Sequence, residues 1–166
     1  MGFGFCRTYS PPSRKKRYIL VCTNYVTKWV EAKPLLFATE AFVVNFLFED
    51  IFTRFGVPRE IFTDQGAQFT SKLVEKMMER YKIRHRKSTP YHPQANGQVE
   101  STNKVLQSTN KVIEGILTKT VHLHRRDWVD RLLEAFWAYK NAWRSKIGHT
   151  PYELVYGKQV LFPIEF

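Results

Sequence analysis

The chain has little cysteine and no long apolar run. Its two cysteines, Cys6 and Cys22, stand in apolar stretches without metal-ligand spacing. This pattern favours cysteines that are small buried residues of a protein in a reducing compartment. The five histidines do not pair with them in a zinc pattern. No segment reaches the roughly 18 apolar residues of a membrane span, and the N-terminus lacks a signal-peptide pattern. We therefore expect an intracellular protein, nuclear or cytoplasmic, that is neither secreted nor membrane-bound.

Acidic residues are also scarce. The sequence has 15 Asp and Glu against 26 Lys and Arg, a formal net charge of +11. Such a surplus attracts polyanions, although charge alone is equally consistent with a basic surface that only keeps the protein in solution. With 43% hydrophobic and 15% aromatic residues, 166 residues suit one domain with one core. We expect a single domain over 1–166, with a possible extra C-terminal tail over 148–166.

Short apolar runs alternate with segments of helical periodicity. The runs predict strands at 3–6, 18–23, 29–32, 60–63 and 83–87. Helices are predicted after N-caps at Thr39 and Ser71, and from Glu100 to about Leu117. Three strands followed by helix, strand, helix, strand and further helices predict an α/β fold of the ribonuclease H type, with a mixed five-stranded sheet flanked by helices.

Helical spacing also predicts which residues are buried. The first helix, ending near Phe52, is expected to bury Phe42, Phe46, Leu47 and Ile51. The second is expected to bury Leu73, Val74, Met77, Met78 and Tyr81. A later stripe is expected in the core or in a subunit interface: Trp128, Leu132, Ala135, Phe136 and Tyr139.

Two acidic residues stand where carboxylates can converge on a metal ion. Asp64 ends a predicted strand and Glu100 opens a predicted helix; since 100 − 64 = 36, 35 residues lie between them. Carboxylate oxygens are the ligands that Mg²⁺ prefers, and two such ions can stabilise a phosphoryl transfer. Taken alone, Asp64 could be an ordinary turn residue before Gly66, and Glu100 a favourable charge at a helix N-terminus.

Four motifs occur in order along the chain. They are Tyr-Val-Thr-Lys-Trp-Val-Glu-Ala at 25–32, Thr-Asp-Gln-Gly-Ala-Gln-Phe-Thr-Ser at 63–71, His-Pro-Gln-Ala-Asn-Gly-Gln-Val-Glu at 92–100 and Thr-Pro-Tyr-Glu-Leu-Val-Tyr-Gly at 150–157. Over nearly the whole chain, the sequence resembles the catalytic core of retroviral-type integrases, most closely those of gypsy-type long-terminal-repeat retrotransposons. The resemblance implies DNA integration by phosphodiester cleavage and strand transfer with Mg²⁺ or Mn²⁺. Asp64 and Glu100 would be catalytic metal ligands.

The same resemblance implies DNA as the partner, assembly into a homo-oligomer and no small-molecule substrate. Lys104, one turn beyond Glu100, matches a DNA-contacting position, or is a solvated helix lysine. Arg84, Arg86 and Lys87 form a basic patch that either contacts DNA or is a solvated face. The loop before Glu100 presents polar side chains suited to bases or phosphates: His92, Gln94, Asn96 and Gln98.

The first strand departs from the family pattern. In these integrases the first catalytic Asp stands in a Trp-Gly-x-Asp-Phe stretch, and aligning Gly2 and Phe5 with it puts Gly4 at the Asp position. Asn24 replaces a second common Asp, one that is not catalytic in the family. We therefore expect a degenerate or truncated copy that binds DNA but is impaired in strand transfer, so that its status as an enzyme is open. The alternatives are a non-catalytic module that binds nucleic acid or another integrase copy, and a nuclease that recruits its missing ligand elsewhere.

Overall fold

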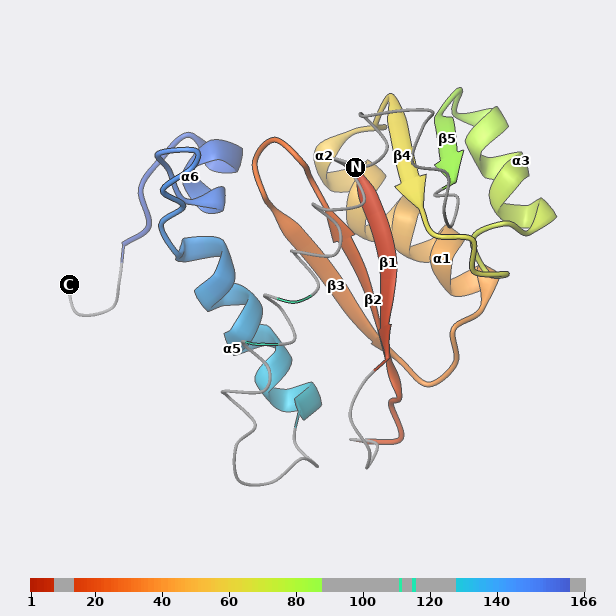
Figure 1. The fold of residues 1–166 in the computed structure, drawn as a ribbon, viewed down its shortest axis with the longest axis horizontal. Helices are drawn as coiled ribbons and strands as arrows, with labels where there is room; N and C mark the ends of the chain where they lie inside the picture. The colour runs from red at the N-terminus through yellow and green to blue at the C-terminus, as the bar shows by residue number, and fades with distance from the viewer. Residues whose placement is uncertain (8–13, 88–110, 112–114, 116–127, 162–166) are drawn as a thin grey trace, which may run out of the picture.

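A five-stranded sheet forms the centre of the molecule (Figure 1). The computed structural model describes residues 1–7, 14–87, 111, 115 and 128–161. Within these residues the strand order is β3-β2-β1-β4-β5, with β1 and β2 antiparallel, β2 and β3 antiparallel, and β4 parallel to both β1 and β5. The strands are β1 (Gly2–Arg7), β2 (Tyr18–Thr23), β3 (Val30–Leu35), β4 (Glu60–Thr63) and β5 (Arg84–Lys87). The predicted mixed sheet is confirmed.

The strands lie close to their predicted positions. Strands β2 and β4 have the predicted bounds, and β1 extends the predicted 3–6 by one residue at each end. Strand β3 begins one residue later than predicted and continues three residues further, through Pro34. Proline lacks a backbone donor, and the structure accommodates it because β3 is an edge strand.

The first helical segment differs from a regular helix. It comprises α1 (Glu40–Phe46), the π-helical turn η1 (Leu47–Phe52) and α2 (Thr53–Phe55). The Thr39 side chain accepts a hydrogen bond from the Phe42 N–H, which confirms the predicted N-cap. The predicted burial of Phe42 is wrong, because Val43 takes the inward position and leaves Phe42 42% exposed. The wider π turn then brings Ile51 and Phe52 to the core.

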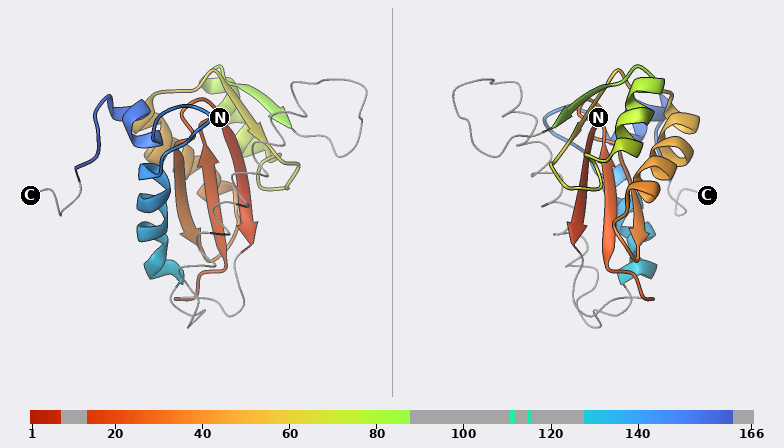
Figure 2. Two further views of the ribbon diagram at one scale, coloured as in Figure 1. Left: turned by 60° about the vertical axis from the view of Figure 1, so that its left-hand side comes forward. Right: turned by 90° about the vertical axis from the view of Figure 1, so that its right-hand side faces the viewer.

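Two apolar layers cover the two faces of the sheet. On one face, Leu20, Cys22 and Ile61 pack against α1, η1 and α3 (Lys72–Arg80). On the other, Ile19, Val21 and the neighbouring strand β3 pack against α5 (Trp128–Asn141). Helix α5 lies beside the β2–β3 end of the sheet and α3 beside the β5 end (Figures 1 and 2). Among the described residues, no helix is long and apolar enough to cross a membrane.

The other predicted faces agree with the structure except at one position. The α5 stripe from Trp128 to Tyr139 is buried at all five positions, in the core as predicted. Ser71 caps α3 by accepting the Val74 N–H, as predicted. Leu73, however, is 41% exposed, because the inward face of α3 is centred on Val74, Met77 and Met78 and Leu73 lies beside it.

The first and last sequence motifs meet at one point of the fold. Helix α6 (Pro151–Tyr156) begins with a capping box between Thr150 and Glu153 and ends at Gly157, whose φ of 68° suits glycine. The ring of Tyr156 packs edge-on against Trp29 of the first motif at 5.5 Å. The first and last motifs are thus joined by a packed aromatic contact.

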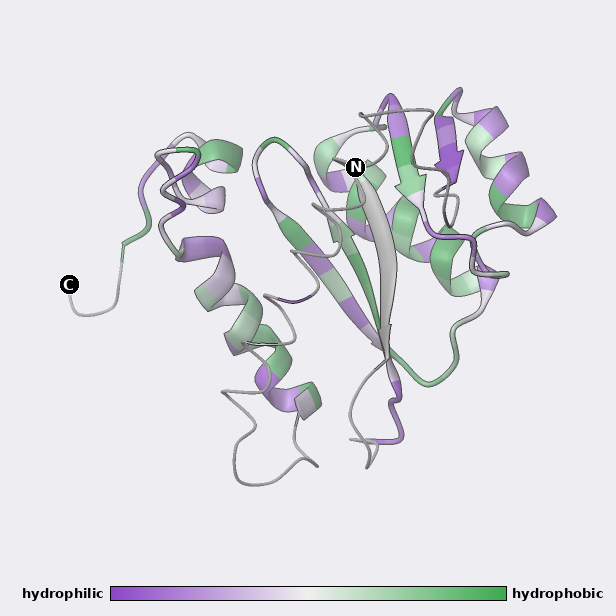
Figure 3. Cartoon of the chain, in the orientation of Figure 1, coloured by the Kyte–Doolittle hydropathy of each residue, from purple (hydrophilic) through white to green (hydrophobic). Residues whose placement is uncertain are grey.

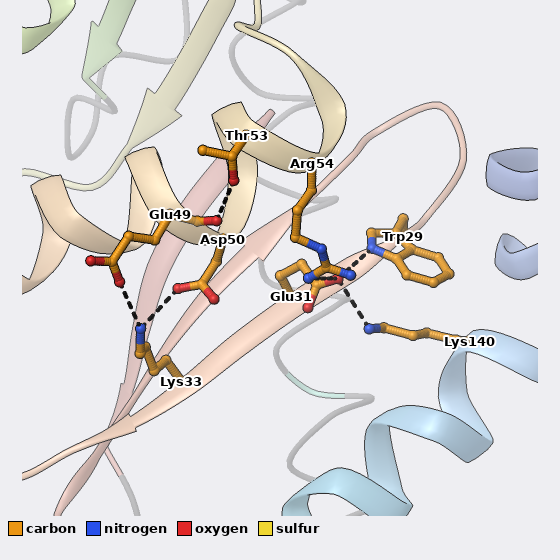
Figure 4. Close-up of polar contacts among 8 residues, drawn as sticks. All are labelled: Trp29, Glu31, Lys33, Glu49, Asp50, Thr53, Arg54 and Lys140. Atoms are coloured by element: carbon orange, nitrogen blue, oxygen red, sulfur yellow. Dashed lines mark hydrogen bonds and ion pairs between the residues drawn. The ribbon is translucent and has the colours of Figure 1, made fainter.

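A charged cluster joins three elements beside this contact (Figure 4). The Glu31 carboxylate accepts hydrogen bonds from Trp29 Nε1 at 2.9 Å and Lys140 Nζ at 3.2 Å, and pairs with Arg54 at 3.1 Å. Lys140 also lies 4.2 Å from the Trp29 ring centroid. Burial lowers the pKa of Lys140, and the Glu31 charge opposes that shift. We call Trp29, Glu31, Arg54 and Lys140 the Glu31 clamp.

Removing the negative charge of the Glu31 clamp should cost more than removing one of its donors. We expect Glu31→Gln to lower the free energy of unfolding by about 2–3 kcal/mol, because Lys140 and Arg54 lose their counter-charge in a largely buried site. Lys140→Met keeps the contact with Trp29 and should cost about 1 kcal/mol. Urea unfolding measures both. The control is Lys33→Met on the same strand as Glu31. It breaks the more exposed pairs of Lys33 with Glu49 and Asp50 and should cost about 0.5 kcal/mol; equal losses for all three variants would contradict the clamp.

Candidate nucleic-acid and metal site

Asp64 lies directly after β4, at the carboxyl end of the strand. Its side chain is exposed, and its Oδ1 accepts the Gly66 N–H at 2.8 Å. A Cβ on Gly66 would lie 2.9 Å from that oxygen and 2.4 Å from Gln68 Nε2, so a larger residue here would require both side chains to move. One carboxylate oxygen therefore orders the turn, and the other is open to a ligand.

Position 4 is the neighbour of Asp64 across the sheet. Strands β1 and β4 pair in parallel, with Gly2 opposite Phe62 and Phe3 opposite Thr63. Continuing this register by one residue places Gly4 opposite Asp64. On its other side Gly4 pairs with Val21, whose side chain belongs to the layer under α5. Since residues directly opposite one another project to the same face, a side chain at position 4 would share a face with Asp64.

The described residues do not fit a two-ion metal site. Asp64 supplies one exposed carboxylate at this end of the sheet, and its neighbour Gly4 supplies none. No group of three or more His, Cys, Asp or Glu that could hold a metal ion occurs within the described part of the chain. The predicted ligand Glu100 lies outside the described residues, as do the predicted DNA-contacting residues His92, Gln94, Asn96, Gln98 and Lys104.

Strand β5 gathers the three cations of the predicted basic patch. Arg86 donates through Nε to Glu60 Oε1, and Arg84 lies 3.6 Å from the same oxygen. Lys87 pairs with Glu75 of α3 at 2.9 Å. The side chain of Arg84 is 72% exposed, against 35% for Arg86 and 36% for Lys87. Arg84 is thus the patch residue most available to an external anion.

The counter-ions of the patch were not anticipated from the sequence. Glu60 stands directly opposite Arg84 in the parallel pairing of β4 and β5, and this pairing joins residues 24 positions apart. The sequence does carry a signal for this ion pairing: an acidic residue begins one predicted strand, and a basic run forms the next. Glu60 stands in an apolar stretch, so without the strand order the sequence did not predict its pairing with the arginines of β5.

His85 occupies the opposite face of β5 and contacts β4. Its Nε2 lies 2.9 Å from the hydroxyl oxygen of Thr63, the residue before Asp64. Burial and then the charge of Lys87 hold the pKa of His85 below its ordinary value of 6.5, while Glu75 raises it by less. The structure therefore favours a neutral imidazole at this position.

Acidification should destabilise the fold through His85. Because the folded-state pKa lies below the unfolded-state value of 6.5, the unfolded chain binds more protons, and stability falls as the pH drops below 6.5. We expect His85→Gln to reduce the loss of Tm between pH 7.5 and 5.5. His149→Gln is the control, since the His149 side chain is 57% exposed. An unchanged pH dependence in His85→Gln would contradict the assignment.

Asn24 has a structural role in the turn after β2. Its Oδ1 accepts the N–H groups of Val26 at 2.9 Å and Thr27 at 3.2 Å. An aspartate oxygen can accept the same two bonds, so either residue suits the turn. Asn24, in place of the family's common Asp, therefore leaves this turn intact.

Sequence comparisons identify the family. Residues 5–93 match the family model "Integrase core domain". The Pol polyprotein of Radiation murine leukemia virus (strain Kaplan) is 36% identical over 141 residues, which cover 85% of this chain and 23% of that protein. The Gag-Pol polyprotein of Baboon endogenous virus (strain M7) is 34% identical over 141 residues, covering 85% of this chain and 8% of that protein. The chain belongs to the integrase core domain family, and it spans less than a quarter of the length of these relatives.

Solved structures show the same fold. A chain of the simian T-cell lymphotropic virus intasome in complex with PP2A regulatory subunit B56 gamma has a TM-score of 0.71 and 18% identity, covering 96% of this chain and 55% of that one. The HTLV-2 integrase catalytic core domain in complex with magnesium (trimeric form) has a TM-score of 0.65 and 18% identity, covering 93% and 94%. The predicted ribonuclease-H-like fold and the predicted retroviral-type integrase core are confirmed. The closer affinity to gypsy-type elements stays a prediction.

Proposed function

We propose that this integrase core binds DNA and is impaired in strand transfer by the glycine at position 4. The observation that carries the proposal is the β1–β4 register, in which Gly4 neighbours Asp64 across the sheet. Integrase cores depend on Mg²⁺, which when bound stabilises the attacking and leaving oxygens of a phosphodiester. A two-ion site needs a carboxylate that bridges both ions, and Gly4 stands where the resemblance expects it. Asp64 and Glu100 would then retain at most one ion, largely through waters, because Mg²⁺ gives up its hydration reluctantly.

Three features support DNA as the partner. The formal charge of +11 attracts a polyanion. Arg84 is exposed at the amino end of the basic strand β5, and Arg86 and Lys87 follow it along the strand. The resemblance adds Lys104 and the polar loop residues His92, Gln94, Asn96 and Gln98. In this proposal these groups hold the phosphates, while Asp64 and Glu100 stand at the cleavage point.

We also propose that the chain acts as an oligomer. The similar structures are an intasome and a trimeric form of a catalytic core. In this chain Leu133 is 80% exposed on the outer face of α5, and Trp137 one turn later is 52% exposed. An apolar stripe of this kind suits a contact between subunits.

A cleavage assay on labelled DNA, scanned over Mg²⁺ and Mn²⁺, tests the impairment. We expect the unmodified chain to bind the duplex in a mobility or anisotropy assay, and to release no cleaved product above a metal-free control. Efficient cleavage by the unmodified chain would overturn the impairment. Absence of binding at low salt would overturn the DNA partnership.

The second candidate is a non-catalytic module that binds an intact integrase core. The missing carboxylate beside Asp64 favours it, because a subunit need not be catalytic to contribute an interface. Sedimentation of this chain mixed with an intact core distinguishes the two. A mixed oligomer together with absent DNA binding would favour the module, and DNA binding by this chain alone would favour the first proposal.

A further inference from the structure

Strand β5 forms one edge of the sheet and is strongly basic. In the described part of the chain, no strand pairs with its outer side (Figure 1). Its four residues, Arg-His-Arg-Lys, are all hydrophilic, and the strand stands out as the most hydrophilic of the sheet (Figure 3). An unpaired edge presents backbone donors and acceptors to any extended chain of compatible charge.

The backbone groups of β5 divide between its two sides. The Arg84 N–H bonds to the Arg59 carbonyl at 3.0 Å, so Arg84 directs its backbone groups toward β4. In a parallel ladder, alternate residues bond to the same neighbour. The N–H and C=O groups of His85 therefore face the open edge, and those of Lys87 do the same. This edge offers donors and acceptors in alternation.

A groove runs beside the edge on the α3 side. It has a volume of about 320 Å³ and is lined by Glu75, Met78 and Glu79 of α3, by Lys82 and Ile83 before β5, and by His85 and Lys87 of β5. The side chains of Arg84 and Arg86 lie on the opposite face of the strand, because side chains alternate between faces. A strand added to β5 would thus place alternate side chains in two different environments. One is arginine-rich, and the other combines the apolar side chains of Met78 and Ile83 with two glutamates and two lysines.

The charges and backbone groups at the outer edge of β5 favour some binding partners over others. A second copy of β5 would bring three cations against three, which disfavours pairing between like strands. A DNA backbone offers acceptors and no donors, so it can pair with the outward N–H of His85 but not with its carbonyl. An extended peptide supplies both. Acidic side chains suit the Arg84 and Arg86 face. In the groove, Lys82 and Lys87 balance the two glutamates, and an apolar side chain can pack near Met78 and Ile83.

We propose that the outer edge of β5 binds an extended peptide of alternating acidic and apolar residues as an added strand. The bound peptide forms backbone hydrogen bonds with His85 and Lys87, and its acidic side chains pair with Arg84 and Arg86. The site lies beyond the DNA-binding role proposed above, and because it shares Arg84 with that role, peptide and DNA compete for it.

Fluorescence anisotropy with a labelled (Glu-Val)₃ peptide tests the proposal, with (Lys-Val)₃ as the matched probe. We expect saturable binding of the acidic peptide alone. Arg84→Glu should weaken it at least about tenfold, a difference of about 1.4 kcal/mol. Lys158→Glu, the same charge change on the exposed segment after α6, should leave binding within about twofold. Equal effects of the two substitutions would mean that net charge alone drives binding, which overturns the proposal.

A backbone variant distinguishes binding of the peptide as an added strand from binding to a charged patch. His85→Pro removes the outward N–H without removing a backbone hydrogen bond to β4, and it should weaken peptide binding at least about tenfold relative to His85→Ala, which likewise lacks the side-chain contact with Thr63. A duplex oligonucleotide is titrated against the same proteins. Loss of DNA binding in Arg84→Glu without any binding of the acidic peptide would assign the edge to DNA and overturn the proposal. If His85→Pro does not fold, a peptide methylated at every backbone nitrogen replaces it, and binding equal to that of the unmodified peptide is the overturning result.

Discussion

Gly4→Asp should produce metal-dependent DNA nicking that the unmodified chain lacks. The register between β1 and β4 puts the new carboxylate beside Asp64. Recovering the second ion restores several kcal/mol of transition-state stabilisation; about 4 kcal/mol corresponds to roughly a thousandfold in rate. Nicking of a labelled duplex in Mg²⁺ or Mn²⁺, compared with a chelated sample, measures the gain.

Two further variants decide what such a gain means. Adding Asp64→Asn to Gly4→Asp should abolish nicking, because Asp64 is proposed as the second carboxylate of the site. Asn24→Asp alone should do nothing, since the side-chain oxygen at position 24 accepts the N–H groups of Val26 and Thr27. Recovery in Asn24→Asp but not in Gly4→Asp would show that the alignment of the first strand is wrong.

DNA binding should depend steeply on salt and weakly on sequence. If about five phosphates are neutralised, the slope of log K against log salt is roughly −4 to −5, and affinity falls about 500-fold between 50 and 200 mM salt. Reversing the charges of Arg84, Arg86, Lys87 and Lys104 should abolish most of the binding. Within β5 the single change Arg84→Glu should account for most of the effect, because the Arg84 side chain is the most exposed of the three and its pair with Glu60 is the longest. Titration of a duplex across salt concentrations measures each case.

The matched control reverses two exposed lysines far from β5. Lys146 and Lys158 lie after α5 and after α6, at the opposite side of the molecule from β5 (Figure 1). Their reversal lowers the net charge without touching the basic patch, so only a small loss of affinity is expected. An affinity independent of salt would remove nucleic acid from the partners of this chain.

The sequence predicted those features that depend on neighbouring residues. Continuous apolar runs located β2 and β4, and Thr39 and Ser71 identified the helix starts because a cap bonds within its own turn. The π turn η1 was not predicted, since it depends on how Ile51 and Phe52 fit the core. Exposure at Phe42 was missed for the same reason.

In the candidate site, too, the sequence predicted the local features and not those that depend on distant residues. The turn that presents Asp64 follows from the local Asp-x-Gly pattern, and the structure has it. The pairing of Arg86 with Glu60 depends on two strands 24 residues apart being neighbours, which composition and periodicity do not encode. The convergence of Asp64 with Glu100 stays a prediction, because Glu100 lies outside the described residues.

The Glu31 clamp has a consequence for how the chain is made. Lys140 and Glu31 are 109 residues apart in sequence, and α5 ends at Asn141, which is 106 residues after the end of β3. At roughly 5–20 residues per second of translation, the ribosome needs about 5–20 s to add that length. Throughout that interval Ile19, Val21 and Val30 lack the helix that covers them in the finished protein. The nascent chain therefore exposes an apolar sheet face, which can bind chaperones or aggregate until the last third of the chain has been synthesised.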